Sequence, residues 1–198
     1  MIRYIVMLLF VVSWVNPALS NDHLHRKKLP ALGLQSGYGF QNGLGVLYHY
    51  EVFFLKFKTI HTIYESEKWA IQVVPQPQFN ISRYKVTNNS AKTDQGIEFG
   101  VNIGFAIMRS FDAGLTGLYF MAGAGPHYVS GVPERQAPGF IFSDNVALGF
   151  TRLLSDRLAL DLSAGFRHIS NASLKRPNGG VNNLVVMGGV VYQVKSEK

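Results

Sequence analysis

Residues 165–183 hold the side chains best suited to chemistry, in the order Gly-Phe-Arg-His-Ile-Ser-Asn-Ala-Ser-Leu-Lys-Arg-Pro-Asn-Gly-Gly-Val-Asn-Asn. His168 and Ser170 are two positions apart, so on a β-strand both side chains project from one face, within reach of each other. An imidazole that takes the proton of a serine hydroxyl turns that serine into a nucleophile. The spacing is compatible with a serine hydrolase site, but the same residue types also suit the polar rim of a membrane barrel, and a motif this short is weak evidence by itself.

Strands are predicted to position this pair, because apolar residues alternate with small or polar residues along most of the chain. From Ile97 to Ile107 every second residue is apolar, and the residues between them are small or polar. About eight such segments have their cores at residues 31–40, 48–58, 68–79, 96–108, 116–128, 139–152, 157–170 and 182–193.

The length and the polar face of these segments favour a transmembrane barrel. Segments of about ten residues match a tilted strand that crosses a bilayer. The non-apolar face is rich in Gly, Ser, Gln and Asn, as in the crowded interior of a small barrel. We therefore predict an all-β fold, an eight-stranded antiparallel outer-membrane β-barrel, with Glu98 and Asp161 as ion-pair partners in its interior. A soluble lipocalin-like periplasmic carrier, with the apolar face turned inward, is an alternative.

Composition excludes several other classes of protein. The chain has 198 residues, no cysteine and a formal net charge of +7, which fits one domain and leaves no thiol for a disulfide scaffold or a zinc ribbon. Its basic residues are scattered, so nucleic acid is not an expected partner. The sequence contains no His-Glu-x-x-His motif and no phosphate loop, and we expect neither a metal nor another cofactor.

An export signal is predicted at the N-terminus. Arg3 precedes an apolar run from Ile5 to Val15, and Ala18-Leu19-Ser20 provides a small-x-small cleavage site. The run is about half of the ~20 residues that a membrane-spanning helix needs. We expect a signal peptide over residues 1–20 that is cleaved near Ser20, a polar leader over residues 21–30, and a single barrel domain over residues 31–198.

Loop lengths predict which end of the barrel faces outward. If both chain ends are periplasmic, the longer loops are the outer ones, at residues 41–47, 80–95, 129–138 and 171–181. The inward turns are then residues 59–67, 109–115 and 153–156. His168 and Ser170 would lie at the outer end of their strand, in the lipid-facing row that contains Phe166. Titratable groups in such a row are costly unless they have a function there.

The segment resembles the lipid A 3-O-deacylase family of outer-membrane barrels, the PagL type, often grouped as acyloxyacyl hydrolases. The family pattern is His-x-Ser-Asn-Ala, four further residues and then Pro-Asn-x-Gly. It is matched here by His168, Ser170, Asn171, Ala172, Pro177, Asn178 and Gly180. Upstream the resemblance is weaker, with Phe140, Phe142 and Gly149 fitting the strand before the motif.

The resemblance implies a carboxylic ester hydrolase that removes an ester-linked (3-hydroxy)acyl chain from the 3-position of lipid A, in the outer membrane of a Gram-negative bacterium. Lipid A or lipopolysaccharide would be the substrate and membrane lipid the surroundings, and a homodimer is compatible with the sequence. Ser170 would be the nucleophile and His168 the general base.

Other residues of the motif would support this pair. Asn171, Asn178 and Gly180 would hold the oxyanion or shape the site, although Asn-Ala and Pro-Asn-Gly-Gly are also ordinary turn sequences. Lys175 and Arg176 would contact lipid phosphates, or they form a solvated pair in the loop.

The third member of the site departs from the family pattern, in which a glutamate lies fourteen positions after the histidine. Asn182 occupies that position here. A hairpin centred near Arg176 would bring it roughly opposite Ser170 and beside His168, where its amide oxygen can accept the imidazole Nδ1–H. An amide cannot stabilise an imidazolium by charge, so we expect lower activity unless another acid substitutes.

Asp144 is the alternative acid, because it shares a face with Phe142 and Val146 on the preceding strand. A turn near residues 153–155 pairs Asp144 with Ala164, which lies four residues or ~13 Å from His168 along the strand. A bulge would instead turn Asp144 toward an interior base such as Arg167.

A second interpretation is a non-catalytic small outer-membrane barrel, used for envelope integrity or adhesion. In that protein the motif is inherited and is weakened by Asn182. Changes in lipid A mass that depend on Ser170 and His168 would distinguish the enzyme from this barrel.

Overall fold

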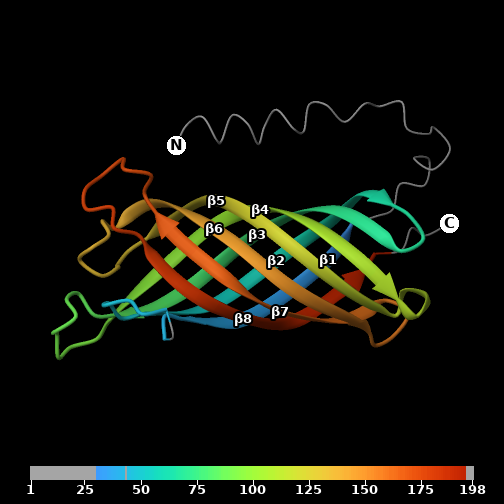
Figure 1. Cartoon of the computed structure of the whole chain (residues 1–198), viewed down its shortest axis with the longest axis horizontal. Coiled ribbons are helices and arrows are strands. Elements are labelled where there is room, and N and C mark those ends of the chain that lie inside the picture. Colours follow the sequence, from blue (N-terminus) through green and yellow to red (C-terminus); the bar gives the residue numbers. More distant parts are fainter. Residues whose placement is uncertain (1–29, 43, 195–198) are drawn as a thin grey trace.

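Eight strands close into a single antiparallel barrel in which each strand pairs with its neighbours in sequence and β8 pairs with β1 (Figure 1). This computed structural model describes residues 30–42 and 44–194. The strands are β1 (Ala31–Phe40), β2 (Tyr50–Glu65), β3 (Trp69–Tyr84), β4 (Asp94–Phe111), β5 (Thr116–Val129), β6 (Gly139–Leu153), β7 (Leu158–Ser170) and β8 (Val181–Gln193), with a short 3-10 turn η1 (Asp112–Gly114). The predicted signal peptide, its cleavage near Ser20 and the leader up to residue 29 lie outside the described residues.

The predicted segments coincide with the eight strands and differ from them at the ends. β2 continues to Glu65 instead of ending near residue 58, since β-branched residues such as Ile60 and Thr62 favour extended backbone. The predicted loop over residues 80–95 shrinks to residues 85–93. Asn80 and Ser82 are residue types that are common in loops, but both are fully buried on the inward face of β3.

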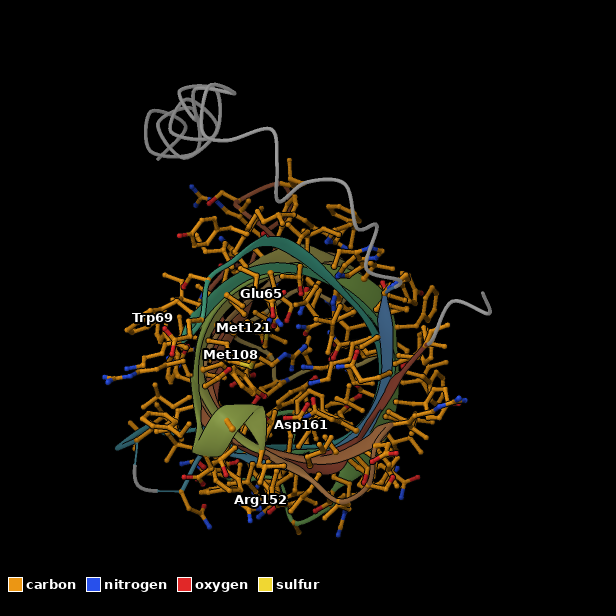
Figure 2. The ribbon with its side chains drawn as sticks, turned by 90° about the vertical axis from the view of Figure 1, so that its right-hand side faces the viewer. Glu65, Trp69, Met108, Met121, Arg152 and Asp161 are labelled. Atoms are coloured by element: carbon orange, nitrogen blue, oxygen red, sulfur yellow. The ribbon has the colours of Figure 1, made fainter. Side chains whose placement is uncertain are left out.

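The two faces of the barrel wall differ sharply in polarity. Figure 2 shows the barrel end-on, with Asp161 pointing into the interior and Trp69 on the outside. Buried polar residues of the strands include Lys56, Lys58, Gln76, Gln78, Asn80, Glu98, Asn102, His127, Asp161 and Arg167. Exposed apolar residues include Leu34, Phe53, Phe79, Phe99, Ile103, Phe120, Leu148, Leu162 and Val186. An apolar outer wall around an interior that holds many buried polar and charged side chains is the pattern of a transmembrane barrel, so the soluble carrier with its apolar face inward is wrong.

The interior is held together by buried charges. Glu98 accepts hydrogen bonds from Arg167 and, at 2.5 Å, from His127. Asp161 accepts from Lys58 and, at 2.8 Å, from the hydroxyl of Tyr119. The prediction that Glu98 and Asp161 form ion pairs in the interior is therefore confirmed. A side chain at Gly149 would meet the Tyr119 ring, because its Cβ would lie 2.0 Å from Tyr119 Cζ.

The connections are longer at one end of the barrel than at the other. Residues 41–49, 85–93, 130–138 and 171–180 form the loops at the left of Figure 1. Residues 66–68, 112–115 and 154–157 form the short turns at the other end. This asymmetry confirms the predicted division into long loops and short turns. Within the described part of the chain no helix is long and apolar enough to cross a membrane, which does not bear on crossing by strands.

Removing the Glu98 carboxylate should destabilise the barrel more than removing an exposed charge. Glu98→Ala leaves Arg167 and His127 buried without their shared acceptor, and we expect the free energy of unfolding to fall by about 3–5 kcal/mol. Lys92→Ala is the control, because Lys92 forms a 3.2 Å ion pair with Asp94 while 84% exposed, and it should change stability by about 0–1 kcal/mol. Urea unfolding in lipid vesicles measures both. Equal effects of the two substitutions would contradict a stabilising role for the interior network.

Candidate active site

His168 and Ser170 lie at the loop end of β7, on the outward face of the wall. Both side chains are half-buried, whereas the alternate residues Arg167 and Ile169 are buried in the interior. The parity argument from the sequence is therefore correct, and the pair faces the same side as Leu162. The two side chains are therefore accessible from outside the barrel and not from its interior.

Asn182 is the direct cross-strand partner of His168 on β8. The imidazole Nδ1–H donates to Asn182 Oδ1 at 2.6 Å, which leaves Nε2 as the unprotonated nitrogen of a neutral ring. The predicted position, roughly opposite Ser170, differs from the observed one by two residues along β7. The β7–β8 hairpin is centred at residue 175 rather than 176, and moving the centre of a hairpin by one residue shifts its register by two.

Asp144 lies directly opposite His168 on the other neighbouring strand, β6. The predicted pairing of Asp144 with Ala164 is therefore wrong, because Ala164 pairs with Leu148. The β6–β7 turn occupies residues 154–157 and is centred two residues later than predicted, so the register shifts by four. Asp144 is exposed on the outward face, and no bulge turns it toward Arg167.

Gly180 packs against the imidazole of His168. A Cβ at this position would lie 2.5 Å from His168 Cε1 and 3.1 Å from Nε2. Gly180 also has a φ of 66°, a region that residues with a side chain seldom adopt. Both observations explain why the site needs glycine here.

Asn171 and Asn178 hold the shape of the loop over residues 171–180. Asn178 Oδ1 accepts the backbone N–H of Asn171 at 2.8 Å, and Asn178 Nδ2 donates to Ser173 Oγ at 3.2 Å. Asn171 is buried, and its Nδ2 donates to the carbonyl of Lys175 at 2.7 Å. Each asparagine therefore uses a side-chain N–H to hold the loop. Lys175 itself and Arg176 are exposed at the loop tip.

A comparison with protein families agrees with this geometry. The sequence profile described as "Lipid A 3-O-deacylase (PagL)" matches residues 59–191, which include every strand from β3 to β7 and the site. The chain belongs to the lipid A 3-O-deacylase (PagL) family. A comparison with curated proteins found no match.

Solved structures similar to this PagL-family chain are outer-membrane barrels. The structure titled "Crystal structure of the outer membrane enzyme PagL" superimposes with a TM-score of 0.60 at 14% sequence identity, covering 80% of this chain and 97% of that one. Neisserial surface protein A gives 0.46 at 15% identity, with 83% and 96% covered. OprG from Pseudomonas aeruginosa gives 0.44 at 11% identity, with 85% and 98% covered. At these sequence identities the similarity shows a shared fold and nothing more.

The loop over residues 130–138 supports the PagL-family motif from a neighbouring strand connection (Figure 1). Gln136 is buried, and its Oε1 accepts the N–H of Gly180 at 3.1 Å. Arg135 donates to the carbonyl of Gly179 at 2.6 Å, and its own carbonyl accepts the N–H of Gly179 at 2.7 Å. The sequence analysis missed both residues, because nothing in their spacing links them to a loop some forty positions away.

Tyr48 supports Asn182 from a third loop. β1 ends at Phe40, which pairs with Leu184, so Asn182 lies beyond the end of β1. The N–H of Asn182 donates to Tyr48 Oη at 2.6 Å instead, and the Arg135 guanidinium lies 4.8 Å from the centre of the Tyr48 ring. The sequence analysis missed this contact, because nothing in the spacing of Tyr48 links it to a residue more than a hundred positions away. Within the described residues no three His, Cys, Asp or Glu side chains are grouped so as to hold a metal ion.

Replacing Gly180 by alanine should displace the His168 ring. The added Cβ would overlap Cε1, so we expect Gly180→Ala to break the hydrogen bond to Asn182, seen as loss of the His168 Nδ1–H resonance in ¹⁵N-histidine-labelled protein in micelles. Gly45→Ala is the matched control, since Gly45 has a φ of 63° and nothing within 4 Å of its Cβ position. Both substitutions should cost about 1–2 kcal/mol for the left-handed backbone. A resonance that survives in both variants would contradict the packing argument.

Proposed function

We propose that this PagL-family chain is an outer-membrane lipid A deacylase in which Ser170 and His168 hydrolyse an ester-linked acyl chain. The observation that carries the proposal is the 2.6 Å hydrogen bond from His168 Nδ1 to Asn182, on the outward face and two residues from Ser170. This bond fixes the imidazole tautomer that a general base needs. A hydrolase that acts on a membrane lipid needs its site on this face, because the ester then reaches the nucleophile without leaving the leaflet.

The reaction proceeds in two half-reactions. His168 Nε2 takes the proton of Ser170 while the serine oxygen attacks the acyl carbonyl carbon. The tetrahedral intermediate then collapses, and His168 gives that proton to the departing sugar oxygen, which leaves as a hydroxyl. Water then attacks the acyl-enzyme, His168 takes its proton and returns it to Ser170, and a free fatty acid is released. Asn182 keeps the imidazole oriented through both steps.

Backbone N–H groups are candidate oxyanion donors, because Asn171 and Asn178 each use a side-chain N–H to hold the loop. The N–H of Asn171 is bonded to Asn178. Ala172 and Ser173 follow with φ values of 51° and 65°, a local conformation that turns successive N–H groups toward one side. We assign oxyanion binding to the N–H groups of these two residues and the shaping of the loop to Asn171, Asn178 and Gly180.

The outer wall offers a place for the acyl chain. An apolar hollow of about 380 Å³ lies between Leu148 and Leu162, with Ala164 in its lining. Ala164 is six residues, about 20 Å, from Ser170 along β7. A (3-hydroxy)acyl chain esterified at the 3-position and lying along β6 and β7 would extend toward this hollow. Lys175 and Arg176, exposed beside the site, are suited to the phosphates of lipid A.

Loss of either member of the pair should abolish deacylation. We expect the intact protein, expressed in a Gram-negative host, to remove one hydroxyacyl mass from lipid A, and Ser170→Ala and His168→Ala to remove none, as measured by mass spectrometry. Fragmentation of the product identifies the position of the lost chain. Ser36→Ala is the matched control, because Ser36 is an exposed, outward-facing serine of β1, two strands from Ser170 around the barrel.

The same experiment distinguishes the non-catalytic barrel. If lipid A is unchanged although the protein shows the heat-dependent electrophoretic shift of a folded barrel, the deacylase proposal fails for that substrate. If deacylation persists in Ser170→Ala, the activity is real but the assigned nucleophile is wrong.

Substitution of Asn182 should separate orientation from charge. Asn182→Ala removes the acceptor of the His168 Nδ1–H, and we expect kcat to fall on the order of 10²-fold. Asn182→Glu keeps an acceptor and adds a charge, so its kcat should equal or exceed that of the natural chain. Leu184→Ala, at the next outward position of β8, is the control. A kcat that neither Asn182 substitution changes would show that Asn182 does not orient the base.

A further inference from the structure

A single carboxylate interrupts the apolar outward row of β6. The row is otherwise formed by Phe140, Phe142, Val146 and Leu148 on the two sides of Asp144. Asp144 is exposed, and its cross-strand neighbour on β5 is Ala124, which cannot compensate its charge. A carboxylate surrounded by apolar side chains on a lipid-facing wall is unfavourable unless a cation forms beside it.

The neighbour of Asp144 on the other side is His168. The two residues are a directly opposed pair of β6 and β7, so their Cβ atoms are about 4.5–5.5 Å apart on the same face. His168 is in turn opposed to Asn182 on β8. The imidazole therefore lies in one row between a carboxylate and an amide, on three strands that are adjacent in Figure 1.

The two neighbours of the imidazole differ in charge and in hydrogen bonding. Asn182 accepts the Nδ1–H at 2.6 Å and fixes the ring, but an amide carries no net charge to oppose an imidazolium. Asp144 forms no ion pair with His168 among the described residues, yet a charge at cross-strand distance in a poorly screened environment still favours a cation. The proposed mechanism makes His168 cationic in both half-reactions.

We propose that Asp144 supplies the negative charge that stabilises protonated His168, while Asn182 supplies the orientation. Two residues on opposite sides of the imidazole then share the work that one carboxylate performs in a Ser-His-acid triad. Asp144 acts through the charge it presents to His168 and does not touch the substrate. The inference rests on the proposed function of Ser170 and His168.

The charged groups of the two loops next to the site, over residues 130–138 and 171–180, do not replace Asp144. Lys175 and Arg176 in the loop after β7 and Arg135 in the loop before β6 are cations. Glu134 is an acid of the same end, but it lies in the loop over residues 130–138 and outside the strand row that contains His168. Glu134 therefore offers a control for the loss of one negative charge.

Steady-state kinetics on lipid A in detergent micelles tests the charge. We expect Asp144→Asn to lower kcat by about 10–100-fold while KM stays within about 2-fold. Asp144→Glu should keep most of the activity, and Glu134→Gln should match the natural chain. Asp144→Leu, whose side chain suits the apolar row, should be as impaired as Asp144→Asn and serves if the asparagine variant folds poorly. An unchanged kcat in both Asp144→Asn and Asp144→Leu would overturn the inference.

Rescue from the opposite side of the imidazole tests the mechanism. A carboxylate at position 182 contacts His168 from β8, so Asn182→Glu should restore kcat in the Asp144→Asn background to within about 3-fold of the natural chain. A merely structural role of Asp144 would leave the double variant as slow as Asp144→Asn, and that result overturns the inference. Failure of the proposed function is seen separately: the natural chain then leaves lipid A unchanged, or Ser170→Ala retains activity whatever Asp144 does.

Discussion

Closure of the backbone hydrogen-bond ladder is the constraint on which the rest of this structure depends. In a membrane every backbone N–H and C=O needs an internal partner, and the pairing of β8 with β1 leaves no free edge. Closure into eight strands makes the interior narrow, so it is filled with side chains, here with paired charges such as Glu98 with Arg167 and Asp161 with Lys58. It also makes the register rigid, and the register is what brings Asp144, His168 and Asn182 into one row.

The sequence predicts the fold and the face of the site well, because both follow from period two. Alternation alone identified all eight strands, and the parity of His168 and Ser170 assigned them to the outward face. The register of strand pairing is harder to predict than the strands themselves. It depends on the centre of the turn, and an error of one residue in that centre shifts the pairing by two residues. A turn centred two residues late was enough to bring Asp144 opposite His168. Contacts between loops are beyond such reasoning, since neither the spacing nor the type of Tyr48 or Gln136 points to residues 180–182.

The candidate site combines residues on strands with residues in a loop. His168, Asn182 and Asp144 lie on strands, where the ladder fixes their backbones. Gly180 and the asparagines lie in a loop, whose position is set by Gln136 and Arg135 from the neighbouring connection. Because Gly180 contacts the imidazole directly, a shift of either loop would displace the ring of His168. The loops over residues 130–138 and 171–180 therefore act as one unit, and an insertion in one of them would disturb a side chain held by the other.

The filled interior has a consequence for how such a protein meets its substrate. Buried Arg167, Glu98 and His127 occupy the space through which a solute would pass. In the proposed function the outer wall therefore carries the reaction, and the lumen is a scaffold. For a reaction on that wall the relevant concentration is the number of lipids per unit area of the leaflet, not an amount per volume of solution. Encounter then becomes a matter of lateral diffusion and of which lipids form the annulus around β6, β7 and β8. The rate would respond to crowding and fluidity of the bilayer as directly as to the chemistry of the side chains.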